Sequence, residues 1–110
     1  MAGFVELTLE QGATFSTQVS VKDANGSSLD LTNFTARSQM RKSYYSSNYS
    51  SFTVTIPNPQ TGNINMSMSS TNTANLSPGR YVFDLEIESN SNDVTRVIEG
   101  IVTVLPNVTR

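Results

Sequence analysis

Short runs in which apolar and polar residues alternate recur along the chain from Phe4 to Leu105. Residues two apart share one face of a β-strand, so each run predicts a strand with one buried and one solvent-facing side. Clusters of Gly, Asn, Ser, Asp and Pro separate the runs, which is typical of an all-β sandwich or barrel. The clearest apolar positions are Phe52, Val54 and Ile56; Ile64, Met66 and Met68; and Tyr81, Phe83, Leu85 and Ile87.

The alternation predicts about seven or eight strands in one sandwich domain over residues 1–110, with short arms at 1–3 and 106–110. A helical turn is expected over 70–76, where Ser or Thr can cap it. Tight turns are expected at 23–26 and 90–93. Gly100 lies inside the last predicted strand and indicates a bulge or a close backbone approach. The predicted strands cover residues 5–9, 15–21, 34–41, 52–56, 64–68, 81–87 and 94–105.

The composition argues against an enzyme. The chain contains no His and no Cys, so it lacks the commonest general base and the thiol nucleophile. No Gly-x-Ser-x-Gly motif occurs, and no glycine-rich loop precedes a helix. We therefore expect no catalytic, cofactor or metal site.

Charge and hydropathy limit the classes of partner that the chain can bind. Seven Lys and Arg stand against nine Asp and Glu, and the one close basic group is Arg37, Arg41 and Lys42. Three cations are too few for the phosphate contacts that hold nucleic acids. No stretch of 18 apolar residues occurs, and the first residues lack the features of a signal peptide. We expect no nucleic-acid or membrane partner, and synthesis in a cytoplasm.

Two acidic groups invite a functional interpretation. Asp84, Glu86 and Glu88 occupy one face of the strongest predicted strand. We interpret them as its solvent-facing side, paired across strands with Arg37, Arg41 or Arg96, rather than as a metal or acid–base site. Residues 23–26 with Asp30 resemble a calcium loop, but the glycine comes fourth instead of sixth, so a hairpin turn is the better interpretation.

Partner contact is expected at two places. Tyr44, Tyr45 and Tyr49 lie in a connection rich in Ser and Asn, a mixture that binding loops favour; an ordinary exposed connection is the alternative. Pro106 ends the last predicted strand and leaves a short arm, in which Val108 and Arg110 could contact a neighbouring molecule.

Two resemblances narrow the fold and the function. The segment NTANLSPGRYVF resembles the corner of immunoglobulin-type sandwiches, in which a tyrosine hydroxyl bonds back to the preceding chain. Tyr81 would be that tyrosine, and Phe83 stands where antibody domains carry their second cysteine. The absence of Cys and Trp excludes an antibody-type core and leaves the architecture.

The whole chain is similar to small tailed-phage virion proteins, and its first half to the amino-terminal sandwich of phage upper baseplate proteins. The matching pieces are Gly-x-x-Phe at 12–15, Asp-Leu-Thr at 30–32, the strand to Arg41, Tyr-x-Phe-Asp-Leu-Glu-Ile at 81–87 and Val-Thr-Arg at 108–110. The resemblance implies a non-enzymatic structural protein of the virion. We expect it to be assembled in the host cytoplasm and to contact other virion proteins in multiple copies.

The expected function is therefore protein–protein attachment in the tail, baseplate or fibre region of a phage particle. A capsid decoration protein on the head shell is one alternative. A carbohydrate- or receptor-binding module is another, in which tyrosines would replace the missing tryptophan as aromatic platforms. Neither alternative requires a cofactor.

Overall fold

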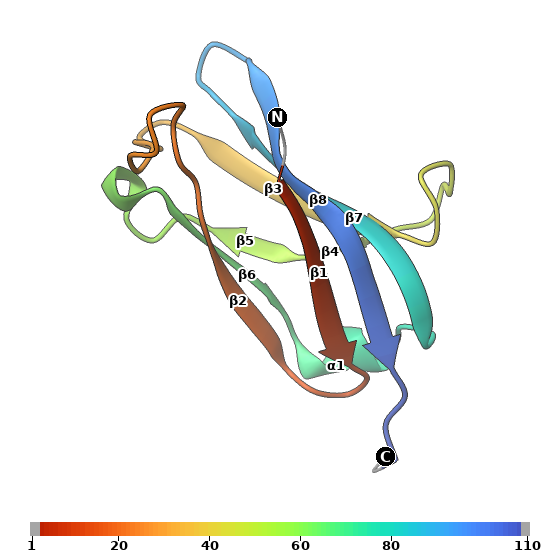
Figure 1. Ribbon diagram of the computed structural model, residues 1–110. Helices are drawn as coiled ribbons and strands as arrows, with labels where there is room; N and C mark the ends of the chain where they lie inside the picture. The colour runs from red at the N-terminus through yellow and green to blue at the C-terminus, as the bar shows by residue number, and fades with distance from the viewer. Residues whose placement is uncertain (1–2, 109–110) are drawn as a thin grey trace.

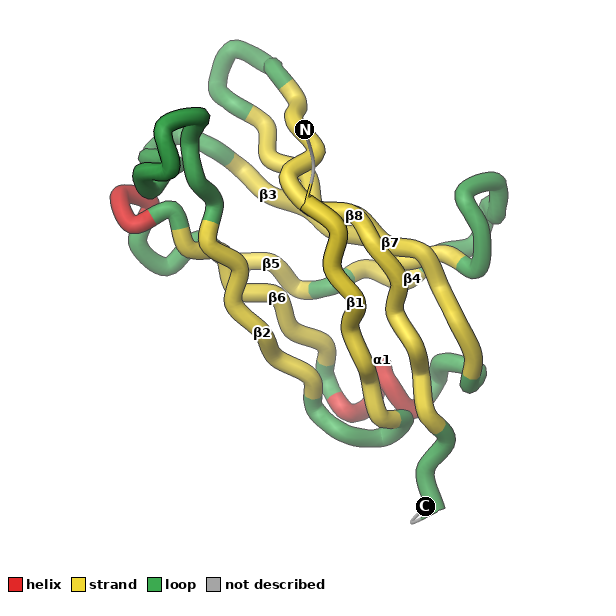
Figure 2. Tube along the Cα trace, viewed as in Figure 1, coloured by secondary structure: helices red, strands yellow, loops and turns green. Residues whose placement is uncertain are grey.

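Two β-sheets packed face to face form the protein, and the computed structural model describes residues 3–108 (Figure 1). The first sheet contains, in spatial order, β1 (Gly3–Glu10), β8 (Val94–Leu105), β7 (Gly79–Glu88), β3 (Thr35–Arg41) and β4 (Ser50–Ser51). The second contains β2 (Phe15–Ser20), β6 (Asn63–Met68) and β5 (Thr53–Thr55). A short 3-10 helix, η1 (Pro59–Thr61), and one helical turn, α1 (Ser70–Ala74), join strands (Figure 2). The predicted all-β sandwich is confirmed.

The strand order is that of an immunoglobulin-type sandwich. β8, β7, β3 and β4 take the places of strands G, F, C and C′, and β2, β6 and β5 take those of B, E and D. β1 pairs in parallel with β8, whereas the neighbours within the rest of each sheet are antiparallel. Each predicted run of alternation thus forms a strand whose apolar side faces the opposite sheet.

An aromatic cluster lies at the centre of the core. The ring centroids of Phe15 and Phe52 are 5.8 Å apart, and those of Phe52 and Phe83 are 6.2 Å apart in an edge-on arrangement. These distances lie within the range in which aromatic pairs attract each other beyond the effect of burial. Met66 is also buried in this core. Phe83, an apolar position of the predicted alternation, is thus buried beside Phe52.

The corner before β7 has the predicted tyrosine. The Ser69 hydroxyl accepts a hydrogen bond from the Asn72 N–H and caps α1. The Tyr81 hydroxyl donates to the carbonyl oxygen of Ser77 at 2.7 Å, four residues upstream. This bond satisfies the one polar atom that the otherwise buried tyrosine ring carries into the core.

The chain changes sheets at Phe52, the first residue of the segment that the alternation assigned to the fourth strand. β4 pairs with β3, the Phe52 N–H donates to the Ser38 carbonyl at 3.1 Å, and β5 then pairs with β6. The predicted strand over 52–56 is therefore shorter than expected, and a two-residue strand precedes it. Alternation could not show this because the phase of buried residues is unbroken across the crossing.

Gly100 marks a close backbone approach. A Cβ atom at this position would lie 1.7 Å from the carbonyl oxygen of Val5, so only glycine lets β1 run beside β8 here. The bulge lies elsewhere, because Leu85 pairs with Ile98 but Glu86 pairs with Arg96, which leaves Val97 as the extra residue. Of the two alternatives expected for Gly100, the close approach is the one present.

Both expected arms require correction. Gly3 begins β1 and pairs with Ile98, so the arm assigned to residues 1–3 is too long. At the other end, the Asn107 N–H donates to Oε1 of Gln11 at 3.4 Å, and the Asn107 side chain lies against Gly12. Asn107 is thus bound to the β1–β2 turn and is half-buried, whereas Pro106 before it and Val108 after it are exposed.

Candidate functional site

The outer face of the five-stranded sheet carries a network of ion pairs. Arg37 on β3 contacts Glu86 at 3.1 Å and Glu88 at 2.9 Å on β7. Arg96 on β8 contacts Asp84 at 3.4 Å and Glu99 at 3.1 Å. The interpretation of the three β7 acids as a solvent-facing side with cross-strand arginine partners is confirmed for these two arginines. Exposed pairs of this kind each stabilise a fold by about 0–1 kcal/mol.

Arg41 does not form the expected ion pair with the acids of β7. Its Nη1 donates to the Ser46 carbonyl at 2.6 Å and its Nη2 donates to Oε1 of Gln39 at 3.0 Å. Its guanidinium carbon lies 4.8 Å from the ring centroid of Tyr49. Arg41 therefore fastens the β3–β4 loop to the sheet instead of forming an ion pair with the acids of β7.

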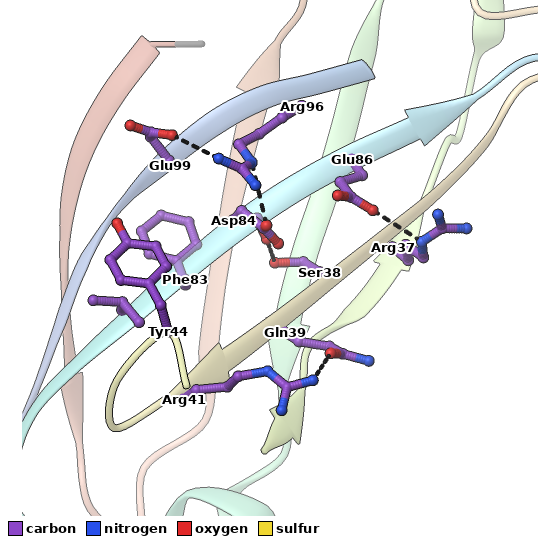
Figure 3. A pocket seen from close by; sticks show the side chains of 11 residues that line it. Arg37, Ser38, Gln39, Arg41, Tyr44, Phe83, Asp84, Glu86, Arg96 and Glu99 are labelled. Atoms are coloured by element: carbon purple, nitrogen blue, oxygen red, sulfur yellow. Dashed lines mark hydrogen bonds and ion pairs between the residues drawn. The ribbon is translucent and has the colours of Figure 1, made fainter. Parts of the chain in front are cut away.

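A hollow of about 270 Å³ lies over this network (Figure 3). Its floor comes from β3, β7 and β8, and Tyr44 from the β3–β4 loop stands at its side. Donor and acceptor side chains alternate around it, so it suits a polar surface group better than an apolar one. The lining residues are Arg37, Ser38, Gln39, Arg41, Tyr44, Val82, Phe83, Asp84, Glu86, Arg96 and Glu99.

Asp84 is a partly buried acid of the hollow. Burial raises the pKa of its carboxyl above the ordinary value, and repulsion from Glu86 adds to the rise. Attraction to Arg96 and Arg41 opposes the rise without cancelling it. Within residues 3–108, no group of three or more His, Cys, Asp or Glu side chains could hold a metal ion. The geometry offers charge and hydrogen bonding to a partner.

The three loop tyrosines do not form one cluster. Tyr44 lines the hollow with 66% of its surface exposed, and Tyr45 points away from the fold with 98% exposed. Tyr49 lies against Arg41 and is more covered than either. The loop projects from the side of the sandwich in Figure 1, and hydrogen bonds from Ser43 to Ser46 close its base.

The other two expected contact residues, Val108 and Arg110, belong to the C-terminal arm. Val108 is 93% exposed and contributes nothing to the core. Arg110 lies outside the described residues. The structure does not bring Val108 together with the tyrosines, since the loop and the C-terminal end leave different sides of the sandwich (Figure 1).

The acidic turn after β2 is a hairpin, as interpreted. Oδ1 of Asp23 accepts hydrogen bonds from the Asn25 and Ser27 N–H groups, and Gly26 adopts a φ of 83°. The carboxylate is therefore occupied by the turn's own backbone. None of the helices in the described part of the chain is long and apolar enough to cross a membrane.

One surface was missed by the sequence interpretation. The outer face of the three-stranded sheet carries no charged residue on its strands, and hydrogen bonds join Gln18 to Asn65 and Ser20 to Asn63 across it. The alternate polar residues of each strand could be seen in the sequence. Only the pairing of β2, β6 and β5 brings these residues together as one continuous surface. Its residues are Ser16, Gln18, Ser20, Thr53, Thr55, Asn63, Asn65 and Ser67.

Comparison with known proteins finds no matching family and two solved structures with partial similarity. No protein-family model matches the chain, and no curated protein sequence matches it. An internalin-like protein of Listeria monocytogenes is similar in structure, with 17% identity and a TM-score of 0.46 over 96% of this chain and 28% of that one. A family 123 glycoside hydrolase from Clostridium perfringens has 12% identity and a TM-score of 0.44 over 98% of this chain and 24% of its own. The chain therefore spans less than a third of either structure.

Proposed function

We propose that this protein is a non-enzymatic structural component of a tailed-phage particle and attaches to other virion proteins in the tail, baseplate or fibre region. The assignment to a virion rests on the sequence resemblance at 12–15, 30–32 and 81–87. The mode of action rests on one structural observation. The β3–β4 loop, held by Arg41, presents Tyr44 and Tyr45 to solvent beside the charged hollow.

That arrangement is suited to protein recognition. Tyrosine supplies a large contact area at a low cost in side-chain entropy, and serine and asparagine around it adapt their hydrogen bonds. The rigid base of the loop lowers the ordering cost of binding. Charged groups that are already paired around the hollow can exchange partners with a complementary surface, which favours specificity more than affinity. In a symmetric particle, many such weak contacts add through multivalency.

A particle-incorporation experiment tests the proposal. Tagged protein is supplied during growth of the phage whose genome encodes it, and particles are purified and analysed by mass spectrometry. We expect the wild type in the particle and a several-fold lower incorporation of the Tyr44→Ala/Tyr45→Ala variant in competition. Phe4→Ala is the matched control, because Phe4 is also an exposed aromatic residue on the five-stranded sheet. Absence of the wild type from purified particles would overturn the assignment.

Separated particle parts distinguish the two placements. Heads and tails of the same preparation are resolved by sedimentation and probed for the protein. Recovery with tails or baseplates supports the attachment role, and recovery with the head shell supports the alternative of capsid decoration.

A carbohydrate-binding module is a second candidate, favoured by the position of Tyr44. Its ring stands beside alternating acidic, amide and guanidinium groups, and such planar polar groups can bind vicinal hydroxyls while the ring stacks on the sugar. Titration with a panel of oligosaccharides, followed by backbone amide NMR, tests it. Shifts confined to β7, β8 and the loop, and lost in Tyr44→Ala but kept in Tyr45→Ala, would support this function over protein attachment.

A further inference from the structure

The two open sheets leave four edge strands, and three of them have features that oppose pairing with another chain. β4 has two residues and β5 has three, so both are short. β1 carries Glu6 and Glu10 on its solvent-facing side. Short length and edge charges are the devices that natural sheets use against edge-to-edge association.

β2 has none of these devices. Its six residues, FSTQVS, include no charge, no proline and no glycine. Its register with β6 runs without a bulge from Phe15–Met68 to Ser20–Asn63. Among the described backbone, β2 forms ladder hydrogen bonds with β6 alone, so its other edge is open.

The phase of the ladder shows which backbone groups face the open edge. Val21 continues the β2–β6 register opposite Gly62, and its N–H donates to the Gly62 carbonyl at 2.8 Å. Hydrogen-bonded and non-hydrogen-bonded pairs alternate along an antiparallel ladder. The N–H and C=O groups of Ser16, Gln18 and Ser20 therefore point away from β6, towards solvent.

Half-buried apolar side chains lie beside this edge. A hollow of about 270 Å³ between β1 and β2 is lined by Val5, Leu7 and Val19 among others. It shares Val19, Ser20 and Ile98 with a second hollow of about 450 Å³ that continues towards the far end of β2. A strand added to β2 would place its inward-facing side chains over this groove.

We propose that the open edge of β2 pairs antiparallel with β2 of a second copy of this chain, to form one continuous six-stranded sheet across a two-fold axis. The distribution of charge favours a second copy as the occupant of β2 rather than of β1. A two-fold axis brings each edge residue opposite itself or a near neighbour, so any charge on the strand would meet its like. β2 and the whole outer face of its sheet carry no charge, whereas self-pairing of β1 would bring Glu6 and Glu10 together.

The same geometry sets the register. The backbone groups at the open edge form the largest number of hydrogen bonds between the copies when Gln18 lies opposite Gln18 of the second copy. Ser16 then lies opposite Ser20. Thr17 then lies opposite Val19 on the inner side, over Val5 and Leu7. A shift by one residue would turn the inner side chains of one copy to the outer face of the other. The contact is small, so the dimer depends on concentration. This inference is independent of the proposed virion role.

Crosslinking tests the register in a chain that has no cysteine of its own. Opposite residues of a hydrogen-bonded antiparallel pair have Cα atoms about 5.5 Å apart, so a short bismaleimide would join two copies of Gln18→Cys. Thr55→Cys, on the same outer face but on β5, is the control. We expect crosslinked dimer from the first variant and not from the second. Equal crosslinking of the two variants would overturn the proposed register.

Sedimentation velocity over a concentration series tests the pairing itself. Gln18→Lys would place two positive charges directly opposite each other, which is destabilising in a sheet. Thr55→Lys adds the same charge at the other edge of the sheet. Both side chains face solvent, and thermal unfolding checks that both variants fold. We expect the wild type and Thr55→Lys to dimerise with rising concentration and Gln18→Lys to remain monomeric. A wild type that stays monomeric throughout, or a Gln18→Lys variant that dimerises like Thr55→Lys, would refute the proposal.

Discussion

At the scale of single residues, the aromatic side chains of the core act as packing anchors between the sheets. Phe83 projects from the middle of β7, is 4% exposed and contacts the ring of Phe52 edge-on. Phe52 comes from the point where the chain crosses between sheets, and Phe15 opens β2. One strand from each sheet and the crossing segment between β4 and β5 are thus joined by one aromatic cluster, so its loss affects the interface between the sheets rather than one strand.

Truncation of the central ring tests this description. We expect Phe83→Ala to lower the free energy of unfolding by about 3–5 kcal/mol, because it removes buried area and leaves a cavity. Urea denaturation measures the change. Phe4→Ala is the control, since Phe4 is 64% exposed, and its effect should stay within about 0.5 kcal/mol. A loss below about 1 kcal/mol for Phe83→Ala would contradict the packing described.

The corner hydrogen bond is a second residue-scale feature. Tyr81→Phe removes the hydroxyl that donates to Ser77 and leaves the ring in place. We expect a loss of about 0.5–1.5 kcal/mol in unfolding free energy, since the Ser77 carbonyl also loses its partner. Tyr45→Phe removes a hydroxyl from an exposed ring and should leave stability unchanged. Equal effects of the two variants in the same denaturation experiment would show that the corner bond does not stabilise the fold.

At the scale of elements, the parallel attachment of β1 to β8 depends on a missing side chain. The carbonyl of Val5 lies where a Cβ of residue 100 would be, and the Phe83 ring lies on the inner side of the same glycine. β1 closes one end of the groove beside β2 through Val5 and Leu7. Its position therefore shapes both the core and the proposed dimer edge.

A methyl group at this position should displace the strand. We expect Gly100→Ala to destabilise the protein by about 1–3 kcal/mol, the usual cost of overpacking, and to increase amide exchange in β1 more than in β6. Gly3→Ala is the matched control, because no atom lies within 4 Å of the added carbon. Unchanged exchange in β1 would mean that the strand tolerates the close approach without moving.

At the scale of the whole molecule, partial burial of the Asp84 carboxyl in the five-stranded sheet makes stability depend on pH. The pKa of Asp84 is raised in the folded state because burial disfavours its charged form. A raised folded pKa means that the folded state binds the proton more tightly than the unfolded state does. Its contribution to stability is therefore present at low pH and is lost as pH rises through the folded pKa.

Comparison of Asp84→Asn with the wild type isolates this effect. Asn cannot ionise, so we expect the variant to gain stability relative to the wild type as pH rises above the ordinary aspartate pKa, with no relative gain below it. Unfolding free energies measured from acid to neutral pH supply the test. The pKa of Asp30, lowered by its hydrogen bonds to Thr32, has the opposite effect but is common to both proteins. A difference that does not vary with pH would contradict the raised pKa.

The amino-acid sequence by itself determined the class of fold, the inward phase of Phe83, the turns at 23–26 and 90–93 and the corner at Tyr81. Each of these is a local property: side chains alternate every two residues, and turn residues act through their own φ angles and nearby hydrogen bonds. The solvent-facing side of β7 could also be predicted, because its polar phase is continuous from Asp84 to Glu88.

Only the tertiary structure decided which strands became neighbours and which residues came together. The hollow beside Tyr44 and the contact of Asn107 with Gln11 join residues far apart in the chain. The edge of β2 is open because β6 is its one neighbour in the sheet of the described chain. A strand's period reveals its buried face but not its partner, since the same alternation fits any neighbour of similar length. The crossing at Phe52 and the bulge at Val97 could not be predicted from the sequence either, because both depend on how the chain pairs with neighbouring strands.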